Sequence, residues 1–296
     1  VGLRLAEGQI AYSVALFVLL LAPEAYLPLR LVGQHFHAAA EGLGAAERIF
    51  AILETPLPSA GTAPMPEGAV TIEVDQLGYT YGGSDNPALA PTSFTALPGT
   101  ITALVGLSGG GKSTLINVLL GFIAPSTGDV RINGTALGDI TPSHWRQAIG
   151  WVPQSPVLVA ADLTESPTIA QVVRLGSPAA TDEEVRVALA DAGIGAEIAE
   201  LPRGIETALN ADGSGLSRGQ LQRLAIARAL LSNPRVLLLD EPIAGMSARE
   251  RDLTAELLQR ICKNRAVIVI EHDMEFVKRI AHKVTVMHQG KLLAEG

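Results

Sequence analysis

The chain is poor in cysteine, in aromatic residues and in positive charge, and each shortage excludes a class of protein. Its one cysteine, Cys262, excludes an internal disulfide and suits a reducing compartment. Aromatic residues make up 4% of the 296 residues, so the 48% hydrophobic content is mostly aliphatic. With 22 basic and 30 acidic residues, the formal net charge of −8 disfavours a nucleic-acid-binding surface.

Long apolar runs are also rare, with one exception near the start. Residues 10–22 carry no charge, and residues 10–29 together make about twenty largely apolar positions, interrupted by Glu24. We expect this stretch to be the cytoplasm-proximal end of a transmembrane helix, with a buried core helix as the alternative. It lacks the cationic start and the cleavage site of a signal peptide. The chain begins at Val1 without an initiator Met, as expected of a fragment.

Proline divides the remaining chain. Residues 34–53 have helical spacing and could continue the apolar helix. Four prolines between positions 56 and 66 then predict a linker over residues 55–69. From Val70 onward, strand and helix patterns alternate.

Apolar or alternating runs predict strands at residues 71–81, 101–105, 129–133, 149–152, 236–240, 266–270 and 284–287. Helical spacing is clearest at residues 113–120, 182–192, 220–231 and 249–262. Strands that alternate with helices predict an α/β architecture with a mainly parallel sheet.

A glycine-rich segment between one such strand and helix carries the strongest chemical signal. Residues 106–113 fit G-x-x-x-x-G-K-[ST], the phosphate-binding loop of nucleoside triphosphatases. Its backbone N–H groups curl around phosphate oxygens, and the lysine reaches the β- and γ-phosphates. The serine hydroxyl supplies a ligand for Mg²⁺. The nucleotide-binding residues predicted here are Gly106, Ser108, Gly109, Gly110, Gly111, Lys112, Ser113 and Thr114. The alternative is a glycine-rich turn that matches by chance.

Two acids end the apolar run at residues 236–239. In a parallel sheet they lie at the carboxyl edge, where the phosphate loop also lies. We expect Asp240 to hold the Mg²⁺ shell and Glu241 to polarise the attacking water. A solvated strand end is the alternative.

Between these two motifs, Leu216-Ser217-Arg218-Gly219-Gln220 precedes LQRLAIARALL. This segment resembles the LSGGQ signature of ABC ATPases, with Arg218 in place of the first glycine. Together with the other motifs in order, it makes residues 70–296 similar to an ABC-type nucleotide-binding domain. The resemblance implies a P-loop core, an antiparallel β subdomain and a helical signature subdomain, behind an N-terminal helical segment at residues 1–54.

The same resemblance implies the roles of further residues. Ser217, Gly219 and Gln220 would cap the γ-phosphate of ATP held by the opposite subunit, since a hydroxyl, an N–H and a helix dipole suit an anion. The site would then be complete only in a head-to-tail dimer.

Three more positions match the family pattern. Gln154 matches the glutamine that senses Mg²⁺ and contacts the membrane partner, and His272 matches the histidine that touches the γ-phosphate. Together with Glu241 and Lys112, His272 completes the expected catalytic set. Tyr81 matches the aromatic residue that stacks on adenine, with Tyr79 as its competitor; both could also be ordinary strand residues.

The two parts of the chain resemble different branches. Residues 1–235 resemble the D subunit of the thiol exporter for cytochrome bd assembly. That family implies a C-type partner, export of cysteine or glutathione, and an inner-membrane location with the ATPase on the cytoplasmic side. Membrane attachment would come from the N-terminal helix or from a transmembrane domain outside this chain.

Residues 236–296 resemble importer ATPases for urea or branched-chain amino acids, which leaves a peripheral importer subunit as the alternative. Compared with the exporter pattern, Asn210-Ala211 replaces a Gly-Glu pair, unless Asp212 substitutes for its glutamate, and residues 161–167 are inserted. Ser247 replaces the D-loop aspartate.

Two other classes remain. A soluble ABC protein acting on ribosomes or DNA usually has two ATPase units, and the acidic balance gives no nucleic-acid footprint. A module that binds ATP without turnover is disfavoured because Lys112, Asp240, Glu241 and His272 are all present.

Overall fold

The structure is a computed structural model, and the chain divides into two compact units, Val1–Pro58 and Ser59–Gly296. The residues described are 1–54, 61–84, 86–107, 109–157, 166–210, 215–288 and 290–296, with the side chains of 29, 30, 33–35, 37 and 38 left out.

The first unit is helical. After α1 (Gly2–Ala6), the single helix α2 (Tyr12–Leu53) contains both the apolar stretch and the residues 34–53 predicted as a helix. Pro23 and Pro28 lie inside it. Within the described ranges, no helix is long and apolar enough to cross a membrane.

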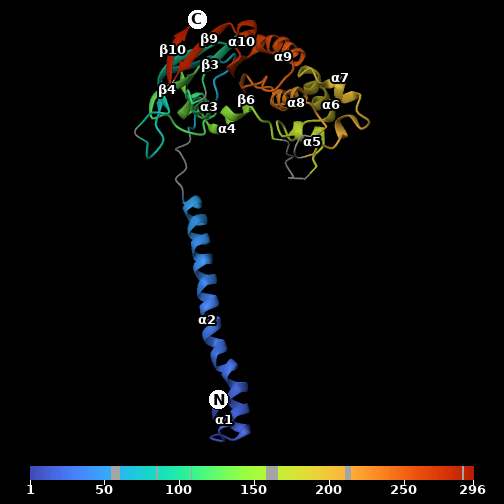
Figure 1. Cartoon of the computed structure of the whole chain (residues 1–296). Coiled ribbons are helices and arrows are strands. Elements are labelled where there is room, and N and C mark those ends of the chain that lie inside the picture. Colours follow the sequence, from blue (N-terminus) through green and yellow to red (C-terminus); the bar gives the residue numbers. More distant parts are fainter. Residues whose placement is uncertain (55–60, 85, 108, 158–165, 211–214, 289) are drawn as a thin grey trace. The chain divides into compact units, whose positions relative to one another are not determined.

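The second unit is built on a six-stranded sheet in the order β10-β9-β3-β8-β7-β6. Its neighbours pair in parallel, except that β10 is antiparallel to β9. In chain order the strands are β3 (Ile101–Gly106), β6 (Ile149–Val152), β7 (Val236–Asp240), β8 (Ala266–Glu271), β9 (Lys283–His288) and β10 (Lys291–Glu295). The predicted mainly parallel α/β sheet is thus confirmed (Figure 1).

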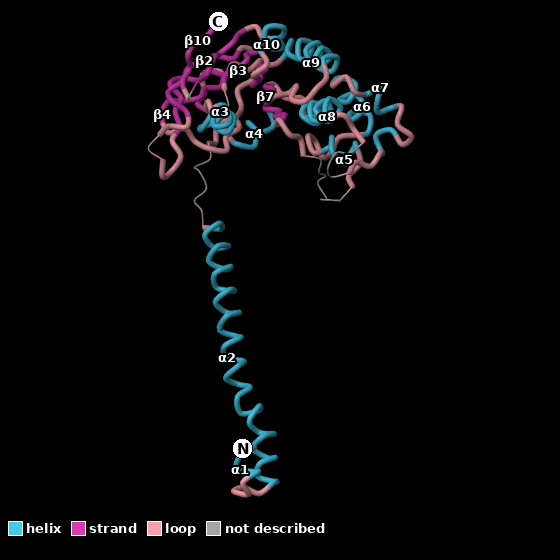
Figure 2. The backbone as a smooth tube through the Cα atoms, in the orientation of Figure 1, coloured by secondary structure: helices cyan, strands magenta, loops and turns pink. Residues whose placement is uncertain are grey.

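The central strands are mostly apolar because both faces of the sheet are buried. Leu237 and Leu239 of β7 enter one hydrophobic core, and Val236 and Leu238 enter the other. The first core holds α9 (Ala248–Ile261), α10 (Met274–Ile280) and the helical subdomain. The second holds α3 (Lys112–Leu119), α4 (Pro142–Ala148) and the antiparallel sheet (Figure 2). Such double burial is what a parallel sheet requires.

The antiparallel subdomain has the strand order β2-β1-β4-β5. Its strands are β1 (Ile72–Tyr79), β2 (Leu89–Ala96), β4 (Thr127–Ile132) and β5 (Thr135–Ala136), followed by the 3₁₀ turn η1 (Leu137–Asp139). The chain joins this region before Val70: Ala63 N–H donates to the carbonyl of Asp139 at 2.8 Å, and Thr141 N–H donates to that of Ala63 at 2.9 Å. Within the predicted linker, residues 61–69 therefore belong to the second unit and include a segment bonded to this subdomain, whereas 55–60 lie outside the described residues.

The helical subdomain lies between β6 and β7 in the chain. It comprises α5 (Ile169–Arg174), α6 (Asp182–Asp191), α7 (Gly195–Ala199), η2 (Gly204–Glu206) and α8 (Arg218–Leu231), while η3 (Cys262–Asn264) follows α9. Helices α5, α6, α8 and α9 each begin with a capping box, Ser or Thr followed three positions later by Gln or Glu. The reciprocal bonds satisfy helix N–H groups that lack partners within the helix.

Candidate nucleotide-binding site

The phosphate loop joins β3 to α3, as predicted. Gly106 ends the strand where a Cβ atom would stand 2.2 Å from the carbonyl oxygen of Met287 on β9, so only glycine fits. Gly111 is the N-cap of α3 with φ at +84°, a conformation that favours glycine. Ser108, predicted as a nucleotide-binding residue, lies outside the described residues.

The lysine of the loop is held by backbone carbonyls. Lys112 Nζ donates to the oxygens of Gly106 at 2.7 Å and of Leu107 at 2.8 Å. These are neutral acceptors, and a phosphate oxygen forms a stronger, charge-assisted bond with an ammonium group. The lysine can therefore exchange the carbonyls for an anion in the loop.

A cavity of about 420 Å³ brings most of the predicted residues together. It is lined by Ala88, Gly109, Gly110, Gly111, Lys112, Ser113, Thr114, Gln154, Asp240 and Glu241. The phosphate loop follows β3, Gln154 follows β6, and Asp240 ends β7, so the cavity lies at the carboxyl edge of the parallel sheet. Ligands of open α/β sheets bind at this edge.

The acids of the cavity differ in setting. Burial raises the pKa of Asp240, and the neighbouring charge of Glu241 raises it further, while Lys112 acts in the opposite direction. Glu241 has φ at +44°, uncommon for a non-glycine residue, and its N–H donates to the carbonyl of Ile270 at 2.9 Å. The Glu241 carboxylate at this strained turn lies beside Gln154 and His272.

Glu241 is held between two predicted site residues. Gln154 Nε2 donates to its Oε2 at 2.6 Å, and His272 Nδ1 lies 3.6 Å from its Oε1. Because the Gln154 nitrogen is engaged, the amide oxygen remains as the atom that could hold a cation. Ser113, Asp240 and Gln154 thus offer a hydroxyl, a carboxylate and an amide oxygen, a hard-oxygen set that fits Mg²⁺.

A buried carboxylate behind this group was not predicted from the sequence. Glu271 is 1% exposed, and it accepts N–H bonds from Ile243 at 3.2 Å and from His272 at 3.1 Å. Burial raises the pKa of Glu271, whereas those two N–H bonds act to lower it. Glu271 fixes the backbone of the turn after Glu241 relative to His272. The signal in the sequence that could have indicated Glu271 is its position directly before His272.

Tyr81, the residue predicted to stack on adenine, lies beside Thr114 of the cavity lining. Tyr81 is 45% exposed, and its hydroxyl lies 3.5 Å from Thr114 Oγ1 in α3. Its ring packs edge-to-face against Tyr79 at a centroid distance of 4.8 Å. Tyr81 is the better placed of the two rings for a base, because Tyr79 packs against the core.

The signature residues lie apart from the cavity. Ser217 is the N-cap of α8, and its Oγ accepts the Gln220 N–H at 3.1 Å. The residues that line the cavity do not include Ser217, Gly219 or Gln220. Residues 211–214 and 158–165, which include Ala211, Asp212 and most of the predicted insertion, lie outside the described residues.

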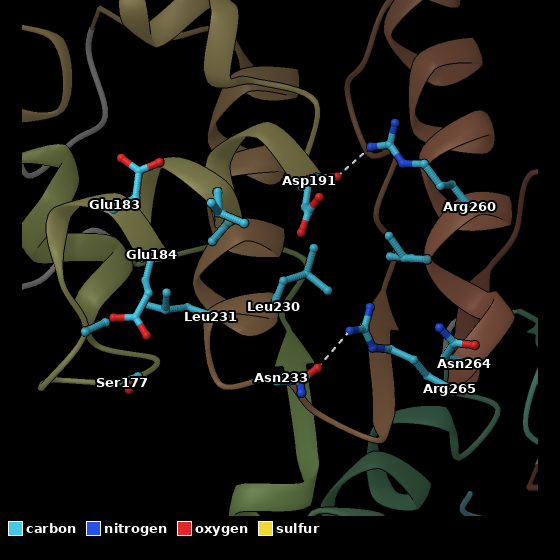
Figure 3. Close-up of a pocket in the computed structure, with 14 residues that line it drawn as sticks. Ser177, Glu183, Glu184, Asp191, Leu230, Leu231, Asn233, Arg260, Asn264 and Arg265 are labelled. Atoms are coloured by element: carbon cyan, nitrogen blue, oxygen red, sulfur yellow. Dashed lines mark hydrogen bonds between the residues drawn. The ribbon is translucent and has the colours of Figure 1, made fainter.

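A second cavity, of about 460 Å³, lies between α6, the end of α8 and the end of α9. Figure 3 shows its two arginines turned to neighbouring groups. Arg260 donates to the backbone carbonyl of Asp191 at 2.6 Å, and Arg265 donates to the side-chain oxygen of Asn233 at 3.2 Å. The first bond joins α9 to the end of α6, and the second joins the residue before β8 to the segment between α8 and β7, so both have a structural role.

The fold and the site define an ATPase class, and comparison with known proteins identifies it. A family model described as ABC transporter matches residues 89–244. The chain therefore belongs to the ABC transporter family and carries its P-loop ATPase domain, coupled in that family to transport.

Among its relatives is the glutathione/L-cysteine transport system ATP-binding/permease protein CydD of Escherichia coli, 37% identical over 100% of this chain and 48% of that protein. The ATP-dependent lipid A-core flippase of Chromobacterium violaceum is 34% identical over 100% of this chain and 50% of that protein. A solved bacterial Atm1-family ABC exporter with ATP bound has a TM-score of 0.76 and 30% identity, over 92% of this chain and 47% of its own.

These relatives correct one expectation from the sequence. The similarity to the E. coli protein extends through the entire chain, so it does not stop near residue 235. The importer alternative, based on residues 236–296, is therefore not favoured. This chain spans about half the length of the curated relatives it matches.

The raised pKa of Asp240 gives a test of the site's electrostatics. Folding raises the pKa of Asp240, so its ionisation costs stability as the pH rises through the unfolded and folded pKa values. In nucleotide-free buffer without Mg²⁺, we expect Asp240→Asn to have a higher free energy of unfolding than the wild type at pH 7.5. The difference should shrink as the pH falls. Urea unfolding at several pH values measures it, with the exposed Asp139→Asn as control; a less stable Asp240→Asn at pH 7.5 would contradict the assignment.

Proposed function

We propose that this chain is the ATP-hydrolysing part of an ABC exporter that moves a small thiol, cysteine or glutathione, outward across the inner membrane. The ATPase domain lies on the cytoplasmic side. The observation that carries the ATPase role is the arrangement of Glu241 between Gln154 and His272, beside the phosphate loop. A module that only stores ATP would have no need of a strained, oriented carboxylate there.

The chemistry follows from these positions. Lys112 and the N–H groups of Gly109–Gly111 hold the phosphates, and Tyr81 stacks on adenine. Glu241 orients and deprotonates the attacking water, while His272 donates to the γ-phosphate. Mg²⁺, when bound by Ser113, Asp240 and Gln154, neutralises phosphate charge. Catalysis of this kind is mostly positioning and charge stabilisation, which matches a site of fixed backbone and few mobile groups.

The γ-phosphate needs donors on its open side as well. Within the described residues, Ser217, Gly219 and Gln220 lie outside the cavity of their own chain, as expected if they act on ATP held by another subunit. We therefore propose a head-to-tail dimer, with either a second copy or a C-type half-transporter as partner.

Support for a thiol comes from two relatives. The CydD proteins of E. coli and of Haemophilus influenzae, both named for glutathione/L-cysteine transport, are 37% and 36% identical to this chain. The path for the substrate belongs to the part of such proteins that this chain does not span.

The role of Glu241 is tested by Glu241→Gln. Removing the charge of the proposed base should lower the ATPase rate by about 100-fold or more and leave ATP affinity within about threefold of the wild type. Steady-state phosphate release and nucleotide-binding titrations measure the two quantities. Unchanged turnover would remove Glu241 from the mechanism.

The shared site predicts a concentration dependence. The specific ATPase activity should rise with protein concentration, or on addition of a C-type partner, because a monomer contains only half of each site. A specific activity that stays constant down to dilute monomer would refute the dimer model. Size-exclusion chromatography at the same concentrations serves as the control for the oligomeric state.

The substrate is tested in lipid vesicles that contain the full exporter assembled with its C-type partner. Glutathione or cysteine should stimulate its ATPase activity, whereas urea and leucine should not. The Glu241→Gln variant controls for contaminating ATPases. Stimulation by leucine or urea alone would contradict a thiol exporter.

A further inference from the structure

The signature helix α8 and the helix α9 after Glu241 are joined at their first turns by one carboxylate. Glu250 Oε1 accepts the hydroxyl proton of Ser217 at 2.7 Å. Its Oε2 accepts from the hydroxyl of Ser247 at 2.8 Å and from the Ser247 N–H at 2.9 Å. These bonds lower the pKa of Glu250, the Ser247 backbone bond most of all, so the carboxylate is charged.

The hydrogen bonds of Ser217 leave its hydroxyl no proton to donate to a phosphate. A serine hydroxyl has one proton and can accept at its oxygen. The Ser217 oxygen accepts the Gln220 N–H at 3.1 Å, and the single proton goes to Glu250. An ionised phosphate oxygen only accepts, so it needs the proton that Glu250 now holds.

Gly219 makes room for the same carboxylate. A Cβ atom at Gly219 would stand 2.3 Å from Glu250 Oε1. Two of the three residues assigned to the γ-phosphate, Ser217 and Gly219, therefore lie against Glu250. A carboxylate and a phosphate are both anions, and they cannot share one donor set at this distance without repulsion.

We propose that Glu250 is a positioning residue that takes the place of the γ-phosphate on the signature helix, so that ATP carried by the other subunit must displace it from Ser217. The proposal rests on the shared site of the proposed function. Glu250 thereby sets the ATP concentration at which the dimer closes. Because it also caps α9 through Ser247, it ties that closure to the segment that follows Glu241.

Glu250→Gln separates these roles. A Gln side chain keeps the capping box, since its amide oxygen can accept from Ser247. Its amide nitrogen then faces Ser217 as a donor, which frees the serine proton. At a fixed protein concentration, KM for ATP should fall by roughly two- to tenfold, the range for one partly screened charge, while kcat does not fall.

Glu256→Gln is the matched control. It makes the same change on the same helix, at an exposed side chain 4.0 Å from Arg279, and should leave KM unchanged. Glu250→Ala serves as a second variant if the Gln variant unfolds, because it also removes the charge; thermal unfolding monitors both. In a Ser217→Ala background, Glu250→Gln should lower KM by less than it does alone.

The outcomes distinguish a failure of the shared site from a failure of the role proposed for Glu250. If Ser217→Ala leaves ATPase activity unchanged, the shared site of the proposed function fails. If Ser217→Ala impairs activity but Glu250→Gln or Glu250→Ala leaves KM unchanged or raises it, the shared site stands and the role of Glu250 is overturned. A lower KM in Glu256→Gln of equal size would also overturn it.

Discussion

The phosphate loop, Asp240, Glu241 and His272 all lie at the ends of parallel strands that are buried on both faces. Strands β3, β7 and β8 pair in strict register, with Leu104 opposite Ile270 and Asp240 opposite the same residue on the other side. Because their side chains enter two cores, a slip along one strand would expose apolar residues and is costly. The phosphate loop, the Asp240–Glu241 pair and His272 therefore meet at one edge without needing contacts of their own.

That edge gathers more negative than positive charge. Asp240, Glu241 and Glu271 lie near one another, and the pKa values of Asp240 and Glu271 are raised mainly by burial. Lys112 is the cation that opposes this effect at Asp240. A bound cation would offset the repulsion within this acidic cluster, which suits a site whose ligand is a nucleotide carried with Mg²⁺.

The sequence predicted the parts of the fold and the site that depend on patterns of neighbouring residues. The phosphate loop, the strand that ends in Asp240 and the helices α6, α8 and α9 were expected within one or two residues of their observed bounds. Strand β2 was missed because Pro91 and three polar residues obscure its alternation. The exporter assignment also needed the comparisons, since the local resemblance of residues 236–296 pointed elsewhere.

Contacts between distant residues were beyond such reading. Ser217 and Glu250 are 33 positions apart, and only the packing of α8 beside α9 brings them together. The capping-box spacing Ser247-x-x-Glu250 was visible in the sequence, but it explains one oxygen of the carboxylate and not the other. Likewise, the bond from Gln154 to Glu241 depends on β6 lying next to β7.

In the proposed dimer, the signature residues of one subunit complete the nucleotide site at the phosphate loop of the other. Mixing two impaired variants of this chain, Lys112→Ala and Ser217→Ala, tests it directly for a dimer of two copies. Half of the dimers formed at random would be mixed, and each mixed dimer contains one intact site, so the account predicts recovery of about a quarter of wild-type ATPase activity. A mixture no more active than the two variants measured apart would contradict it.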